Sequence, residues 1–216
     1  FFNSFFMNYV KRLIMANKEL AGISSQLELF ACKLEDAAKN GRIIFSCGNG
    51  GSASDSDHIS GELLKSFIIK RRLKKNIVDD FVKYYGEDGI KISDKLEEGI
   101  KSISIGSFQA FLSAYSNDVD WEMAYAQFLY VMGSKGDVII GISCSGNAKN
   151  VLNAFKVAKV KGIYSILLTG ENEGICVNYC DLCIKVPERD TYRIQEYHSM
   201  IYHAVCAEVE RRIFSE

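Results

Sequence analysis

The segment CGNGGSASDSDHISGELLKSF, from Cys47 to Phe67, places a glycine-rich loop between a short apolar run and a polar stretch. The run RIIFSC, from Arg42 to Cys47, is rich in β-branched residues and closed by glycines, which is typical of a buried strand. The stretch from Ser52 to about Lys70 has the composition of a helix. A loop of this kind is either an ordinary capped turn or a cradle for an anion, and the loop alone leaves both interpretations open.

The rest of the chain continues this alternation of strands and helices. We expect two helices within residues 4–39, broken near Gly22–Ser25, and further elements as follows: strands at 102–105, 137–142, 163–169 and 182–186, and helices at 120–132, 148–161 and 192–214. The strands are continuously apolar rather than alternating, as expected when helices cover both faces of a parallel sheet. The pattern therefore predicts an α/β fold with a parallel sheet between two helical layers.

The length and composition of the chain favour one domain. With 216 residues and 48% hydrophobic content, the chain can build one sizeable core. It contains a single proline, Pro187, and no Pro- or Ser-rich linker. We therefore predict one domain over residues 1–216. Residues 69–101 are charged and poorly periodic, and we interpret them as an insertion that holds a short helix or two.

The helices predicted within residues 4–39 carry more apolar surface than a small monomer would expose. The opening segment FFNSFFMNYVKRL is apolar but lacks the basic region of a signal peptide, so we expect it to begin an amphipathic helix. We predict that this surface lies in an oligomer interface. The residues concerned are Phe5, Phe6, Leu13, Ile14, Leu27, Leu29 and Phe30.

Charge and cysteine content exclude several classes of protein. The formal net charge is −1, which points neither to nucleic acid nor to a membrane surface. The basic run KRRLKK, from Lys70 to Lys75, is interpreted as a solvated face or loop. No apolar run reaches the roughly 18 to 20 residues that a membrane span needs. The cysteines are odd in number, seven, and the chain is not small, so we expect reduced thiols and a cytoplasmic location.

Two loops have the composition of anion sites. SCGNGGSAS follows the first predicted strand and SCSGNAKN follows the third, at the strand ends where α/β proteins bind ligands. Glycines allow close approach of a ligand, helix N-termini favour an anion, and Ser52, Ser143 and Ser145 add hydroxyl groups. Neither the GK[ST] nor the GxGxxG motif of nucleotide sites is complete. Each loop alone could be an ordinary capped turn, but the two together favour anion binding.

The three histidines lie on two of the predicted helices. His58 and Glu62 are four residues apart and share a face, as a proton shuttle, a metal site or a plain solvent-facing pair would. The terminal segment RIQEYHSMIYH carries the other two. Helical geometry aligns His203 best with Glu196, whereas Gln195 lies about 80° round the helix. Spacing alone does not choose between these two partners.

Taken together, these segments resemble the phosphoheptose isomerases, the sedoheptulose 7-phosphate isomerases of the sugar isomerase (SIS) family. The motifs that carry the resemblance are, in chain order, CGNGGSASDSDHISGEL, SND (116–118), GDVIIGISCSGNAKNV, ILLTG and RIQEYHSMIYH. They span most of the chain apart from residues 69–101. The resemblance implies a five-stranded parallel sheet in flavodoxin-like order, with helices in residues 1–40 that serve oligomerisation. It also implies a homotetramer with active sites between subunits.

The resemblance further implies an activity and a role for each site residue. The family converts sedoheptulose 7-phosphate to D-glycero-D-manno-heptose 7-phosphate through an enediol, on the way to ADP- or GDP-activated heptose for cell-surface polysaccharide. Glu62 matches the base that moves the proton between C1 and C2, and His203 matches its acid/base partner. Zinc is implied as a possible cofactor, held by His58, Glu62, Gln195 and His203. The implied substrate-binding residues are Asn49, Gly50, Ser52, Asn117, Asp118, Ser143, Cys144, Ser145 and Gln195, with residues 143–145 at the phosphate.

Three features depart from the family pattern or leave alternatives open. Ala148 stands where members often carry a phosphate-binding serine, and Cys144 stands where threonine is usual. The backbone N–H survives at both positions, so we expect weaker hydroxyl contacts rather than loss of the site. The insertion at 69–101 could reshape the rim of the pocket, which keeps an isomerase of another sugar phosphate as an alternative. A non-catalytic SIS regulatory protein is the other alternative, and the presence of Glu62 and His203 argues against it.

Overall fold

A five-stranded parallel sheet forms the centre of the computed structural model, which describes residues 8–215. The strand order is β2-β1-β3-β4-β5, as predicted from the resemblance. Neighbouring strands pair in parallel, and β1 pairs with β3 over five residues. The strands are β1 (Ile44–Gly48), β2 (Ser102–Ser104), β3 (Val138–Ile142), β4 (Tyr164–Thr169) and β5 (Leu182–Lys185).

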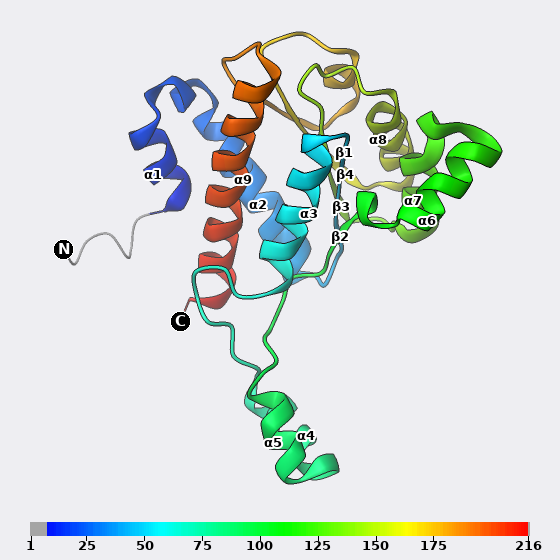
Figure 1. Cartoon of the computed structure of the whole chain (residues 1–216). Coiled ribbons are helices and arrows are strands. Elements are labelled where there is room, and N and C mark those ends of the chain that lie inside the picture. Colours follow the sequence, from blue (N-terminus) through cyan, green and yellow to red (C-terminus); the bar gives the residue numbers. More distant parts are fainter. Residues whose placement is uncertain (1–7, 216) are drawn as a thin grey trace.

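Helices cover both faces of this sheet, so that each face has its own core (Figure 1). Successive strand residues point to opposite faces: Ile44 packs into one core, and Phe45 into the other. The first core lies under α2 (Ser24–Lys39), α3 (Gly51–Leu64) and α9 (Thr191–Phe214). The second lies under α7 (Ala124–Met132) and α8 (Lys149–Lys161). This confirms the predicted α/β architecture.

Shorter elements complete the chain. The N-terminal part has α1 (Tyr9–Ala16) and the 3₁₀ helix η1 (Lys18–Ile23). Between β2 and α7 lie η2 (Ile105–Ser107), α6 (Gln109–Tyr115), the π-helix η3 (Ser116–Asp120) and η4 (Trp121–Met123), and η5 (Ile175–Tyr179) precedes β5. The sequence pattern did not predict α6, and the first helix ends at Ala16 rather than near Gly22 because a 3₁₀ turn follows it.

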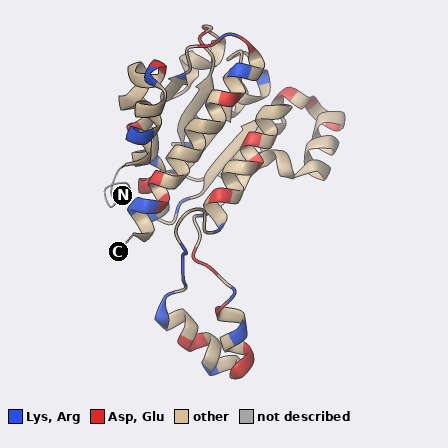
Figure 2. Ribbon diagram, turned by 60° about the vertical axis from the view of Figure 1, so that its left-hand side comes forward, with Lys and Arg blue, Asp and Glu red and all other residues tan. Residues whose placement is uncertain are grey.

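The segment interpreted as an insertion forms a helical hairpin that projects from the body (Figure 1). Its helices are α4 (Lys75–Tyr85) and α5 (Glu87–Ser93), joined at Gly86, whose φ of 58° favours glycine. A Cβ on Gly89 would lie 2.1 Å from the Phe81 carbonyl oxygen, so the two helices touch closely there. Figure 2 shows both signs of charge along the hairpin, which gives it no overall basic or acidic character.

The prediction that the early helices bury their apolar residues in an oligomer interface is wrong for part of the set. Leu27 and Phe30 are 0% and 1% exposed within the single chain, where they pack between α2, α9 and the sheet. Leu13 and Ile14 pack against the same core, and Leu29 alone of the described members is exposed. Phe5 and Phe6 lie outside the described residues. The sequence pattern could not separate a core-facing helix from an interface helix.

Two further findings concern composition. All seven cysteines lie within residues 8–215 and are free thiols. The interpretation that the chain has no C-x-x-C pair is wrong, because Cys180 and Cys183 have this spacing. A side-chain hydrogen bond with Cys180 lowers the pKa of the Cys183 thiol. Across residues 8–215, no helix is both long enough and apolar enough to cross a membrane.

Candidate active site

The two glycine-rich loops lie side by side at the carboxyl end of the sheet. β1 and β3 are paired neighbours, with Gly48 opposite Ile142, so the loops that follow them meet. A Cβ on Gly48 would lie 2.5 Å from the Ser52 carbonyl oxygen, which requires glycine at that turn. The Ser52 hydroxyl lies 3.8 Å from Cys144 Sγ across the two loops. The two loops therefore lie next to each other at the carboxyl end of the sheet, where they were expected.

The second loop leaves donors available for an anion. The Ser143 hydroxyl accepts the Ala148 N–H at 3.3 Å and the Ser145 hydroxyl accepts the Asn147 N–H at 3.2 Å, so both hydroxyl protons remain free to donate. Helix α8 begins after Ala148 without a side-chain cap. Its first N–H groups and its dipole therefore favour a negative charge at this loop.

Asn49 is held rigidly beside these donors. Its amide exchanges hydrogen bonds with the amide of Asn150, at 3.0 and 2.9 Å, and the Tyr125 hydroxyl donates to the Gly48 carbonyl oxygen. These contacts fix the first loop against α7 and α8. Neither Tyr125 nor Asn150 was predicted from the sequence.

A second group of polar residues forms where α3 packs on α9. Glu62 Oε1 lies 3.0 Å from His58 Nε2, and the same nitrogen lies 3.3 Å from His203 Nε2. We call His58, Glu62 and His203 the acid–base cluster. Glu62 is almost buried, whereas His58 is half exposed. Burial and the neighbouring His58 lower the pKa of His203, which keeps its imidazole neutral near pH 7.

Residues beneath the cluster orient His58. The Tyr202 hydroxyl lies 3.2 Å from His58 Nδ1 and 3.2 Å from Asp55 Oδ1. Burial raises the pKa of the Asp55 carboxyl, whose other oxygen is buried without a partner among the described residues. Neither Asp55 nor Tyr202 was predicted from the sequence. Both could have been found from their places in the sequence, because Asp55 precedes His58 by three residues and Tyr202 is next to His203.

The predicted site residues therefore fall into two groups within one chain. Gln195 lies at the loops, because a Cβ on Gly51 would come within 2.5 Å of its amide nitrogen. Glu62 follows Gly51 by eleven residues, about 16 Å along α3 at 1.5 Å per residue. Glu196, the alternative partner of His203, is half exposed and pairs with Arg193 instead. We call Asn49, Gly50, Ser52, Ser143, Cys144, Ser145 and Gln195 the loop group.

Asn117 and Asp118 lie apart from both groups. They are exposed in η3, where the Asn117 amide donates to the Asp118 carboxylate at 3.0 Å. Within residues 8–215, no hydrogen bond joins them to the loop group. Their predicted role in substrate binding remains a prediction.

Comparison with known proteins assigns the family. A phosphoheptose isomerase of Aneurinibacillus thermoaerophilus is 36% identical over 205 residues, which cover 95% of this chain and 89% of that protein. The chain belongs to the phosphoheptose isomerase family. The family model of the SIS domain matches residues 124–207. Phosphoheptose isomerase 2 of Campylobacter jejuni is 37% identical over 96% of this chain and 89% of its own length.

Solved structures of phosphoheptose isomerases share the fold. The enzyme from Neisseria gonorrhoeae superposes with a TM-score of 0.72 at 25% identity, covering 93% of this chain and 94% of that one. The enzyme from Francisella tularensis has a TM-score of 0.74 at 23% identity, over 94% of this chain and 95% of its own, and shows the common fold.

The zinc set implied by the resemblance is only partly assembled in this family member. Two imidazoles and a carboxylate suit zinc chemically, but Glu62 and His203 both approach one nitrogen of His58 rather than a common point. Gln195 lies at the loop group. Within the described chain, no three His, Cys, Asp or Glu side chains are arranged so as to hold a metal ion. In a single chain the cluster is therefore hydrogen-bonded, not a formed metal site.

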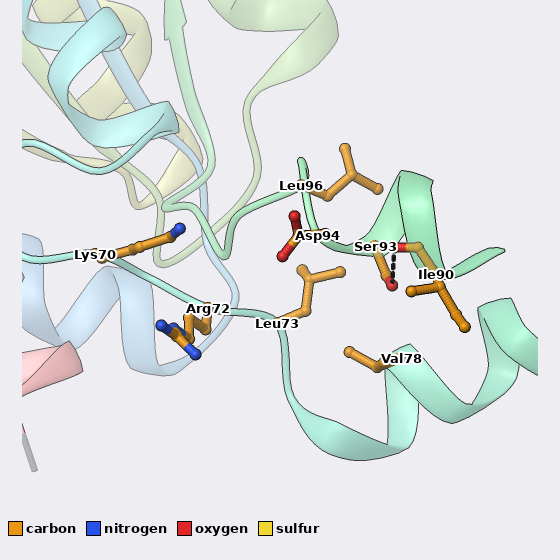
Figure 3. A pocket seen from close by; sticks show the side chains of 8 residues that line it. All are labelled: Lys70, Arg72, Leu73, Val78, Ile90, Ser93, Asp94 and Leu96. Atoms are coloured by element: carbon orange, nitrogen blue, oxygen red, sulfur yellow. Dashed lines mark hydrogen bonds between the residues drawn. The ribbon is translucent and has the colours of Figure 1, made fainter. Parts of the chain in front are cut away.

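The hairpin has a pocket of its own at its base (Figure 3). The pocket has a volume of about 310 Å³. Leu73, Val78, Ile90 and Leu96 give it an apolar lining, and Lys70, Arg72, Ser93 and Asp94 complete it. None of the residues predicted for the isomerase site lines this pocket.

Proposed function

We propose that this protein is an aldose–ketose isomerase that converts sedoheptulose 7-phosphate to D-glycero-D-manno-heptose 7-phosphate. The observation that carries the proposal is the acid–base cluster, in which Glu62 and His203 meet through His58 across two helices. The curated relatives of 36% and 37% identity bear the name phosphoheptose isomerase. A non-catalytic regulatory protein would need neither group, so this alternative is not favoured.

The loop group supplies the anchor for the distal phosphate. We assign the Ser143 and Ser145 hydroxyls, the backbone of Cys144 and the N-terminus of α8 as its donors, because both hydroxyl protons are free and α8 has no side-chain cap. Anchoring the phosphate fixes C1 and C2 of the sugar relative to the base, which lowers the entropic part of the barrier. Ser52 and Asn49 would contact the sugar hydroxyls beside it.

The acid–base cluster supplies the chemistry. Glu62 takes a proton from C1 of the ketose, while His203 gives a proton to the oxygen on C2, which forms the enediol. His203 then takes the proton from the oxygen on C1, and Glu62 returns its proton to C2, which leaves the aldose. A lowered pKa suits His203 for this exchange, because its neutral ring can both donate and accept a proton.

We further propose that the enzyme is a homotetramer in which each site joins two subunits. Two observations support this. Glu62 of the cluster and Gly51, which lies beside Gln195 of the loop group, are at opposite ends of α3, about 16 Å apart along the helix axis. The body also exposes large apolar residues around α7, including Trp121 at 53%, Tyr130 at 61% and Val131 at 65%. Such a surface is typical of a protein interface.

Zinc and location complete the proposal. We propose that His58, Glu62 and His203 hold zinc in the assembled enzyme, with Gln195 contributed across a subunit boundary. Bound there, zinc would polarise the substrate oxygens as a Lewis acid. Metal analysis of protein purified without chelator should give about one zinc per chain in the wild type and none in a His58→Ala variant.

We place the enzyme in the cytoplasm, in agreement with its seven free thiols.

A substrate panel tests the proposed reaction. Sedoheptulose 7-phosphate should be turned over with a higher kcat/KM than other ketose phosphates of five to seven carbons. Preference for a shorter sugar would replace the proposed substrate while keeping the isomerase chemistry. That outcome would direct attention to the hairpin, which adjoins the C-terminal end of α3.

A further inference from the structure

A fully buried ion pair lies directly beneath the acid–base cluster. Arg71 Nε donates to Glu210 Oε1 at 2.7 Å, and both side chains are 0% exposed. The Glu210 carboxylate also accepts the backbone N–H groups of Phe67, Ile68 and Ile69, at 2.8, 2.7 and 3.1 Å. Its charge is therefore satisfied on every side, as a buried carboxylate requires.

The remaining nitrogens of Arg71 hold the end of α3. Nη1 donates to the Leu63 carbonyl oxygen at 2.7 Å, and Nη2 donates to the Glu62 carbonyl oxygen at 3.0 Å. Carbonyl groups in the last turn of a helix have no partner within the helix, and a cation there is favourable. Arg71 thus fixes the backbone of the residue that carries the proposed base.

The partner of Arg71 lies on the helix that carries the second catalytic group. Glu210 and His203 are both on α9, seven residues apart, which places them on nearly the same face two turns from each other. Arg71 therefore ties the last turn of α3 to α9. Its guanidinium also lies over the ring of Phe214, 4.8 Å from the ring centroid, which fixes the plane of the fork.

We propose that Arg71 is a positioning residue for the isomerisation: with Glu210, it holds the last turn of α3 so that the Glu62 carboxylate faces His58 and His203. The inference rests on the proposed function, because Glu62 is a base only in that reaction. Arginine is required because its rigid fork reaches one carboxylate and two carbonyl oxygens at once, which lysine cannot do. Stability alone does not explain the pair, since apolar residues of similar volume often replace a buried ion pair without loss.

The hairpin is built onto the same residue. The Arg71 N–H donates to the Ser66 hydroxyl at 2.8 Å, and the Arg71 carbonyl oxygen accepts the Glu98 N–H at 2.8 Å. One arm of the hairpin leaves the body at Arg71, and the other returns at Glu98. The base of the hairpin and the position of Glu62 are therefore set by one side chain and its backbone.

Two variants test the proposal. The double variant Arg71→Met/Glu210→Met removes the pair without leaving a buried charge, and Arg71→Lys keeps the charge with a single nitrogen. The matched control is Arg212→Met/Glu208→Met. This ion pair also lies on α9, with Glu208 fully buried, but it faces α1 and α2 through Tyr9, Glu28 and Glu35.

Both Arg71 variants should lower kcat for the ketose phosphate by about 10- to 100-fold, the loss expected from a displacement of about 1 Å at a catalytic group. KM should stay within twofold, because the loop group is untouched. Amide hydrogen exchange of residues 62–66 should become faster than in the wild type. The control should change neither kcat nor the exchange of residues 62–66.

A folded Arg71 variant that keeps its kcat within twofold, with wild-type exchange at residues 62–66, would overturn the proposal. Failure of the proposed function gives a different result, since the wild type itself would then turn over no ketose phosphate. In that case the exchange measurement still decides: unchanged exchange in the Arg71 variants refutes the positioning role, and faster exchange confined to residues 62–66 supports it.

Discussion

His203 Nε2 lies 3.3 Å from His58 Nε2, and this contact joins two helices whose residues are 145 positions apart in the chain. Glu62 completes the contact from the side of α3. The site thus depends on how α3 and α9 pack, because neither helix alone brings a base and its acid/base partner together.

Replacing the base should abolish most turnover without unfolding the protein. Glu62→Gln keeps the size of the side chain and its hydrogen bonding to His58 but cannot accept a proton from carbon. We expect kcat to fall by about 10²- to 10⁴-fold, the usual contribution of a general base. Steady-state kinetics measures the loss, and an unchanged circular dichroism spectrum and melting temperature would show that the fold is intact. Near wild-type kcat would mean that another residue is the base.

Subunit mixing tests whether each site joins two chains. A Glu62→Gln chain keeps an intact loop group, and a Ser143→Ala/Ser145→Ala chain keeps an intact acid–base cluster. When the two inactive variants are unfolded together and refolded, mixed interfaces should restore a sizeable fraction of wild-type activity. Each variant refolded alone is the control. If the mixture is as inactive as its components, each site is formed within one chain and the tetramer proposal loses its catalytic basis.

The buried His198 should make stability depend on pH. Burial lowers its pKa from 6.5 to about 4, and neither ring nitrogen has a partner among the described residues. Below pH 6.5 the unfolded chain binds a proton that the folded chain does not, so stability falls as the pH drops from 6.5 toward 4. At pH 5 this residue should cost about 2 kcal/mol of the free energy of unfolding relative to pH 7.5.

Urea denaturation of the wild type and of His198→Leu, at pH 7.5 and pH 5, checks this directly. The variant should lose about 2 kcal/mol less than the wild type between the two pH values, because leucine does not titrate. Equal losses in the two proteins would show that His198 is protonated in the folded state.

Ala148 offers a gain-of-stability test at the phosphate loop. It occupies the N-cap position of α8 in the β region, with φ −65° and ψ 111°, and has no side chain that can accept a helix N–H. Ala148→Ser should stabilise the fold by about 1 kcal/mol, which raises Tm by about 2–4 °C in a chain of this size. It should also lower KM for the sugar phosphate through one added hydroxyl contact. An unchanged Tm and KM would contradict both expected roles of a serine at this position.

Much of the fold could be predicted from local patterns. The strands are short apolar runs closed by glycine, and parallel pairing then places the loops after β1 and β3 at one edge. The end of a helix could not be predicted where contacts with residues distant in the chain determine it. Helix α3 was expected to run to Lys70, but it ends at Leu64, because Arg71 and Glu210 hold its last carbonyl groups and the chain beyond them. These two residues are 139 positions apart.

The candidate site, too, could be predicted only where its residues lie on one helix. Spacing placed His58 and Glu62 on one face correctly, since both lie on one helix. Spacing left Gln195 and Glu196 open as partners of His203, and Glu196 pairs with Arg193 three residues earlier. Only the packing of α3 on α9 shows that His203 faces His58. That packing depends on the sheet beneath both helices, which no local pattern contains.

Proton NMR of the purified protein with sedoheptulose 7-phosphate tests the central claim most directly. The account predicts that the anomeric signals of D-glycero-D-manno-heptose 7-phosphate appear with wild-type protein and fail to appear with Glu62→Gln at the same concentration. In ²H₂O, deuterium should also enter at C2 of the product, because the proton on the Glu62 carboxyl exchanges with solvent before it is returned. No product from the wild type, or equal product from both proteins, would contradict the account.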